Sequence, residues 1–211
     1  MLEQEEGLRT KIILASASPR RKQIFEAMGL DFKIISPVDC DEEMSGDPYD
    51  IVCRNSISKA KNIFGGQGSG KLEMIQSGEG FRFLISSFDT IVSIEDRILG
   101  KPSGPGEGYE FISLLSGRAH RVISGVCVLD SSTGKYEYSR SSTQVSFRKL
   151  SESEIRNYIS QNDVLDKAAA YNINGPGLVL VEKINGCFYN AAGVPVYEYI
   201  RLLKKFNYKI L

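Results

Sequence analysis

Hydrophobic and polar positions alternate with two different periods along the chain, and these periods predict strands and helices in turn. Short apolar runs predict strands at residues 11–15, 32–36, 83–94, 121–130, 137–147 and 178–184. Apolar residues that recur every three or four positions predict helices at 20–28, 48–64, 108–115, 151–160 and 196–206. A chain that alternates strands and helices in this way is expected to form an α/β fold.

The boundaries of the folded unit follow from residues at helix ends and from polar segments. Asp47 precedes one predicted helix and Ser151 begins another, and each is expected to cap its helix. Residues 1–10 are polar and acidic and predict a disordered tail, which leaves one domain over 11–211. Within this domain, residues 65–80 are rich in Gly, Ser and Gln, have no apolar period and predict a flexible inserted loop.

Charge and cysteine content exclude several classes of protein. Lys and Arg number 26, and so do Asp and Glu, so no net charge draws the protein to nucleic acid or to a membrane surface. No apolar run approaches the roughly 20 residues that span a bilayer, and the acidic start does not resemble a signal peptide. Four cysteines without a C-x-x-C pair argue against disulfides and thiolate zinc, and they predict a cytoplasmic location.

His120 is the only histidine, which excludes every metal site built from several histidines. A metal in this protein is therefore expected to be held by carboxylates, which favour Mg²⁺ or Mn²⁺. His120 lies in a predicted strand and Cys40 lies among acidic residues, and for both a structural role is the favoured interpretation.

The strongest local feature is a predicted strand that ends in small hydroxyl residues, including Ser16, directly before a helix that begins with Arg20 and Arg21. Amides at a helix N-terminus attract phosphate, and the planar guanidinium of Arg matches phosphate oxygens. Basic residues in a first turn oppose the helix dipole, a cost that a bound anion reverses. The alternative is an ordinary helix start with two solvated arginines, and this segment alone does not decide between them.

Acidic residues form two further candidates. Asp89 interrupts an otherwise apolar predicted strand, where an acid facing the core must be paired, metal-bound or catalytic, although the strand could equally point it outward. Four acids lie close together in the loop after the second predicted strand, and they form either a metal-binding cluster or a solvated loop: Asp39, Asp41, Glu42 and Glu43. Lys59 in a predicted helix and Lys101 in a turn could each supply a charge for phosphate or lie on the surface.

Two further segments combine glycine or small residues with polar groups. Residues 65–71, GGQGSGK, match most of a Walker A loop, but Leu72 stands where Ser or Thr would bind Mg²⁺ and a helix precedes the segment, which disfavours that interpretation. Residues 165–175 place polar groups beside small residues and are expected to form the wall of a pocket.

A series of short motifs, each weak alone, resembles the Maf family of nucleotide pyrophosphatases when taken in order. The motifs are LASASPRR, DCDEE, KAK, FDTIV, LGKP, LSGRAH, VSFRKLSESEI, LDKAAAYNING and NAAGVPVYEYIRLL. They cover nearly the whole chain apart from the first ten residues and 65–80. The resemblance implies a fold similar to the inosine-triphosphate pyrophosphatases, with a mixed twisted sheet flanked by helices and two lobes around a cleft.

The resemblance also implies an activity: hydrolysis of nucleoside triphosphates to monophosphate and pyrophosphate, with Mg²⁺ or Mn²⁺ and usually as a homodimer. Water would attack the α-phosphorus. Phosphate binding is implied for Ser16, Arg20 and Arg21, and Lys59 and Lys101 would add charge for the substrate. Glu42 would serve the metal or the water, Asp89 would accept the proton and contact the metal, and Lys101 would assist catalysis.

The preferred base is implied by fewer residues. LSGRAH and the segments around ING resemble the branch that acts on dTTP, UTP and modified pyrimidine triphosphates. In that branch Arg20, Thr90 and a Gln contribute to specificity, and the Gln position corresponds here to Asn174. Asn is one methylene shorter, so its reach to a base changes by about an ångström. Phe88 also replaces the Ala common before the Asp-Thr pair.

Two other functions remain as alternatives. A regulatory protein of cell division could keep the nucleotide site and have little turnover, but such a site would be expected to lose Asp89, Lys101 or an arginine, and all are present. A nucleic-acid-binding protein would need a basic surface or a recognisable motif, and the sequence has neither.

Overall fold

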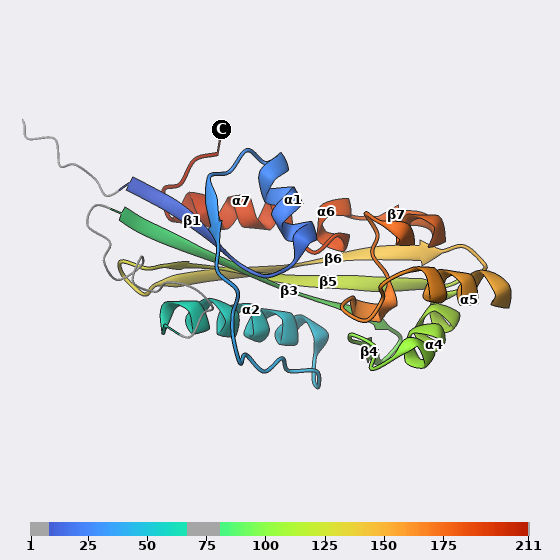
Figure 1. The fold of residues 1–211 in the computed structure, drawn as a ribbon. Coiled ribbons are helices and arrows are strands. Elements are labelled where there is room, and N and C mark those ends of the chain that lie inside the picture. The colour runs from blue at the N-terminus through green and yellow to red at the C-terminus, as the bar shows by residue number, and fades with distance from the viewer. Residues whose placement is uncertain (1–8, 67–80, 211) are drawn as a thin grey trace, which may run out of the picture.

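One mixed β-sheet runs through the molecule, and helices cover both of its faces (Figure 1). The computed structural model describes residues 9–66 and 81–210, and within them seven strands form the sheet in the order β2-β1-β3-β5-β6-β7, with β4 also paired to β3. The strands are β1 (Arg9–Ala15), β2 (Phe32–Ile34), β3 (Phe81–Ile94), β4 (Arg97–Leu99), β5 (Ala119–Asp130), β6 (Tyr136–Phe147) and β7 (Val181–Asn185). This architecture confirms the predicted α/β fold.

The helices divide between the two faces of the sheet. The α-helices are α1 (Pro19–Ala27), α2 (Pro48–Phe64), α4 (Pro105–Leu115), α5 (Glu152–Gln161), α6 (Phe188–Ala191) and α7 (Val196–Lys205). Two 3₁₀ helices are η1 (Ala168–Ala170) and η2 (Pro176–Leu180). Helix α2 lies along one face, and α1, α6 and α7 lie on the other (Figure 1).

The burial of β1 explains why its sequence is a continuous apolar run. Ile12 and Leu14 belong to the core that contains Phe25 of α1, whereas Ile13 belongs to the core that contains Ile63 of α2. A strand covered by helices on both faces needs apolar residues at successive positions. The run therefore reflects a layer of helices above and below.

Strand β3 has a gap along one of its edges. Its residues Phe81–Ser87 pair with β1 in parallel, and its residues Val92–Ile94 pair with β4 in antiparallel orientation. Between these two stretches, residues 88–91 have no strand partner on that side among the described residues. On the other side β5 pairs continuously with β3 from Leu84 to Ser93. Because of this gap, side chains from both faces of β3 can be reached from the same edge of the strand.

Helix α2 lies in close contact with the sheet at Gly125 of β5. A Cβ atom added to Gly125 would lie 2.2 Å from the carbonyl oxygen of Val52. Gly125 stands opposite Asp89 of β3, and directly opposite residues of antiparallel strands project from the same face. The absent side chain therefore lets α2 reach the point where Asp89 leaves the sheet.

Most predicted elements are confirmed, with corrections at the ends. Residues 178–184 were predicted as one strand, but η2 occupies the first part and β7 begins only at Val181, because Pro176 starts a 3₁₀ turn. Helix α6 was not predicted, because its four residues are too few to show a period. Strand β1 begins at Arg9, inside the predicted tail, while the rest of that tail and most of the predicted loop, 67–80, lie outside the described residues.

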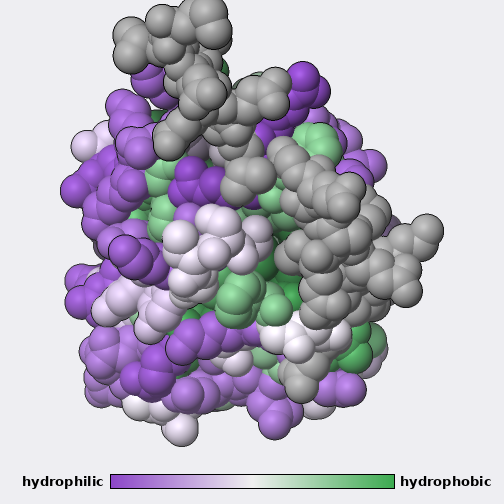
Figure 2. Space-filling model, turned by 90° about the vertical axis from the view of Figure 1, so that its left-hand side faces the viewer, coloured by the Kyte–Doolittle hydropathy of each residue, from purple (hydrophilic) through white to green (hydrophobic). Residues whose placement is uncertain are grey.

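Polar residues dominate the surface seen along the sheet from the end where β1 begins, around a smaller apolar area (Figure 2). Within residues 9–66 and 81–210, no helix is both long and apolar enough to cross a membrane.

Replacing Gly125 by Ala is expected to destabilise the protein, because the added methyl group meets rigid backbone of α2 rather than a flexible side chain. We expect a loss of at least about 2 kcal/mol in the free energy of unfolding, measured in urea. Gly106→Ala in α4 is the matched control, because a Cβ there meets nothing within 4 Å. Equal stability of the two variants would contradict the close approach of α2.

Candidate active site

A cleft of about 1010 Å³ opens where β3 lacks a partner. It is lined by the end of β1 and the start of α1, by the loop between β2 and α2, by β3, and by loops that follow β4, α5 and α6. The predicted site residues in its lining are Ser16, Arg20, Arg21, Glu42, Lys59, Asp89, Thr90 and Lys101. The structure thus brings together every predicted site residue except Asn174.

On one side of the cleft, Arg21 is held by neutral acceptors. Its guanidinium donates to Ser16 Oγ (3.2 Å), to Thr90 Oγ1 (3.2 Å) and to the carbonyl of Gly193 (3.0 Å). Loss of hydration lowers the pKa of Arg21 to about 10, although attraction to Asp89 opposes the shift. Hydroxyl and carbonyl partners fix the direction of the guanidinium without neutralising its charge. This arrangement suits a bound anion.

The start of α1 adds further donors beside Arg21. Pro19 occupies the first turn, no acidic residue lies there, and the N-cap Ser18 makes no side-chain capping bond. Ser16 Oγ accepts from the Ser18 amide (3.2 Å). Burial also lowers the pKa of Arg20, which attraction to Asp166 across the cleft partly offsets. The two arginines and the helix N-terminus therefore form one positively polarised wall.

On the opposite face of β3, Lys59 of α2 joins two carboxylates. Its Nζ lies 2.5 Å from Asp89 Oδ1 and 2.7 Å from Glu42 Oε1. Asp89 is only 4% exposed, so of the two orientations considered for its side chain, inward or outward, the structure has the inward one, paired with Lys59. Lys101 Nζ lies 3.7 Å from Glu42 Oε2. Partial burial acts to raise the pKa of Glu42, but Lys59, Lys101 and Arg21 together lower it below its ordinary value.

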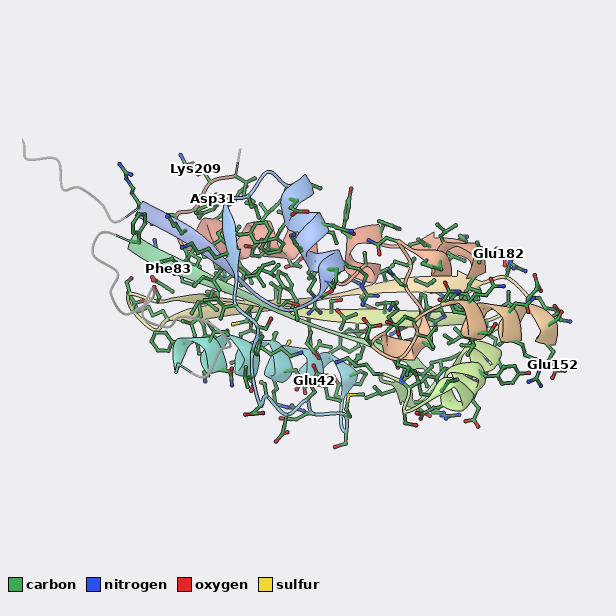
Figure 3. The ribbon with its side chains drawn as sticks, in the orientation of Figure 1. Asp31, Glu42, Phe83, Glu152, Glu182 and Lys209 are labelled. Atoms are coloured by element: carbon green, nitrogen blue, oxygen red, sulfur yellow. The ribbon has the colours of Figure 1, made fainter. Side chains whose placement is uncertain are left out.

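The four predicted acids separate in the structure. Asp39 and Asp41 line the cleft with Glu42, whereas Glu43 pairs with the exposed Arg54 at 2.7 Å. Glu42 lies beside α2 in Figure 3, while Glu152 and Glu182 lie at the end formed by α5 and β7. In the part of the chain that the structure describes, no three His, Cys, Asp or Glu side chains form a group that could by itself hold a metal.

Residues 165–175 form part of the far wall of the cleft, as predicted. Asp166, Lys167, Tyr171 and Asn172 line it, but Asn174 is exposed and lies outside the lining. The backbone N–H of Asn174 donates to Asn172 Oδ1 (3.3 Å), so the Asn172 side chain is held by this turn. A contact of Asn174 with a base stays a prediction, and Asn172 is the neighbouring asparagine that lines the cleft.

Two groups at the site were missed by the sequence analysis. The carbonyl of Gly193, in the loop after α6, anchors Arg21, and no side-chain pattern signals a carbonyl acceptor. Asn55 of α2 donates to Asp89 Oδ2 (3.0 Å). Asn55 stands four residues before Lys59 and so shares its helix face, which is the signal that could have identified it.

His120 lies behind the cleft wall rather than in it. It is 2% exposed, its Nε2 lies 2.8 Å from Tyr171 Oη, and its ring packs edge-to-face on Phe147. Its Nδ1 is buried with no hydrogen-bond partner. Burial lowers the pKa of His120 to about 4. The imidazole is therefore neutral at physiological pH and supports Tyr171 from behind.

A model of a protein family, described as Maf-like protein, matches residues 11–206. The chain belongs to the Maf family. Among its relatives, a dTTP/UTP pyrophosphatase from Dictyoglomus thermophilum is 36% identical over 208 residues, which cover 97% of this chain and 100% of that protein. Another dTTP/UTP pyrophosphatase, from Bacillus thuringiensis subsp. konkukian, is 38% identical over 198 residues, 93% of this chain and 96% of that protein. The Maf resemblance that the motifs indicated is thereby confirmed.

The buried His120 predicts a pH dependence of stability. Its pKa of about 4 lies below the ordinary value of 6.5, so the unfolded chain binds a proton between these values that the folded protein does not. Stability should therefore fall as pH drops through this window, by about 2 kcal/mol between pH 7 and pH 5. His120→Gln should lack this component in urea unfolding at the two pH values. A titration of the single imidazole near pH 6.5 by NMR in the folded protein would contradict the assignment.

Proposed function

We propose that this protein is a nucleoside triphosphate pyrophosphatase that acts on dTTP, UTP or modified pyrimidine nucleoside triphosphates and releases the monophosphate and pyrophosphate. The relatives named dTTP/UTP pyrophosphatase support the reaction and the substrates dTTP and UTP. The observation that carries the proposal is a single cleft with Arg20 and Arg21 on one side of β3 and the Glu42–Lys59–Asp89 cluster on the other.

The arrangement matches what phosphoryl-type transfer needs from a protein, which is positioning and charge rather than covalent chemistry. The α1 N-terminus, Ser16 and Arg21 bind phosphate oxygens, and the exposed side chain of Lys101 in the cleft lining adds a further positive charge. Lys59 holds Asp89 and Glu42 close together through its two ion pairs. Asp89 then orients a water molecule and accepts its proton as the oxygen attacks the α-phosphorus and pyrophosphate leaves.

A divalent ion, Mg²⁺ or Mn²⁺, is part of the proposal. Mg²⁺ commonly takes one or two protein carboxylates and completes its shell with substrate phosphates and water. Glu42 and Asp89 converge on one ammonium group, so two carboxylates are available at one place, and this donor set fits. When bound, the ion would neutralise charge on the phosphate oxygens.

The proposal also includes a cytoplasmic location and a homodimer. All four cysteines are free, which fits the reducing conditions of the cytoplasm. The homodimer expected from the resemblance stays a prediction.

We expect Asp89→Asn to fold and to lower turnover by about 100- to 10,000-fold, because the amide cannot accept the proton of the attacking water. The assay measures pyrophosphate and monophosphate release from dTTP, UTP, modified pyrimidine and purine triphosphates. Asp96→Asn, in the exposed turn between β3 and β4, serves as control. Tight nucleotide binding without release in the unmodified protein would favour the regulatory alternative.

Removing divalent ions should abolish most of the activity, because the proposed ion neutralises charge on the substrate phosphates. With excess chelator we expect turnover to fall at least about tenfold and to return when Mg²⁺ or Mn²⁺ is added in excess over the chelator. Chelator saturated with Mg²⁺ beforehand is the control. Full turnover in metal-free buffer would rule out the carboxylate-bound ion.

A further inference from the structure

Asn55, a residue of α2 that the reaction as described does not use, is buried at the acidic side of the cleft. It is 2% exposed, and its side-chain amide makes three hydrogen bonds. Its Nδ2 donates to Asp89 Oδ2 (3.0 Å) and to the carbonyl of Glu43 (3.0 Å). Its Oδ1 accepts from the Glu43 amide (2.9 Å). One amide thus contacts both Asp89 and the loop residue next to Glu42.

Asn55 complements Lys59, which stands one helical turn further along α2. Lys59 contacts Oδ1 of Asp89 and the side-chain carboxylate of Glu42. Asn55 instead contacts Oδ2 of Asp89 and the backbone of the loop at Glu43. Asp89 therefore has both oxygens held by the same helix, one by a cation and one by a neutral amide. An amide donor fixes the plane of the carboxylate without adding the charge that a second lysine would bring.

We propose that Asn55 is a positioning residue that sets the orientation of Asp89 and its distance from Glu42 for the attack of water on the α-phosphorus. This inference rests on the proposed function. Asn55 does not need to touch the substrate. It acts through Asp89 and through the backbone beside Glu42, so its loss should lower kcat more than it changes the KM for the nucleotide.

The chain offers a matched control on the same helix. Asn62, seven residues after Asn55, holds the same loop in the same manner: its Oδ1 accepts from the Val38 amide (3.2 Å) and its Nδ2 donates to the Val38 carbonyl (2.9 Å). Both asparagines therefore tether the loop between β2 and α2. The bond to Asp89 distinguishes Asn55, so a comparison of the two positions separates tethering from positioning.

The test measures kcat and KM for dTTP and UTP in the unmodified protein and in the variants Asn55→Leu, Asn55→Asp and Asn62→Leu, with thermal melting as a check of folding. Asn55→Leu removes all three bonds at similar volume. Asn55→Asp keeps an acceptor for the Glu43 amide but presents a like charge to Asp89. We expect both Asn55 variants to lower kcat by about 10- to 100-fold with KM changed less than about threefold. Asn62→Leu should lower kcat less than about threefold.

Three results would overturn the inference while the proposed function stands. They are a normal kcat in folded Asn55→Asp, an effect confined to KM, and equal losses in Asn55→Leu and Asn62→Leu. Absence of pyrophosphate release by the unmodified protein would instead overturn the proposed function, and the positioning role of Asn55 with it. The two failures are therefore distinguishable within one set of assays.

Discussion

The acidic half of the active site depends on how closely α2 lies to the sheet. A carboxylate buried as deeply as Asp89 needs a cation and donors within contact distance, because loss of hydration would otherwise neutralise or expel it. Gly125, directly opposite Asp89, has no side chain to hold the helix away. The backbone at Val52 therefore lies against the strand, and the next two turns of α2 bring Asn55 and Lys59 to the two oxygens of Asp89.

The gap in the edge of β3 decides how the charges are distributed. Asp89 and Thr90 are neighbours in the chain and so point to opposite faces of the sheet. Both line the same cleft because, within residues 9–66 and 81–210, no strand covers that edge between β1 and β4. Arg21 binds the Thr90 side and Lys59 binds the Asp89 side. The guanidinium and the carboxylates are thus kept from pairing with each other. Arg21 keeps its charge for an anion, and Lys59 keeps the two carboxylates together.

Local sequence patterns predicted much of the fold. The periods of apolar residues located α2 and the long strands β3, β5 and β6, because these elements bury a regular stripe or face. The cap at Asp47 was also readable, since its side chain accepts from the two amides that follow Pro48. The 3₁₀ turn at η2 and the short helix α6 escaped prediction, because neither is long enough for a period and both depend on the elements around them.

The sequence by itself determined the residue types of the site and their order along the chain: two arginines at a helix start, an acid within an apolar strand, and lysines nearby. It did not determine whether Asp89 faced inward, which acids shared one cation, or that Asn55 took part. Those outcomes depend on contacts between residues far apart in the chain, such as Asn55 with Asp89 and Arg21 with Gly193. No local period encodes such pairs, because the approach of α2 to β5 and the gap beside β3 exist only once the sheet has formed.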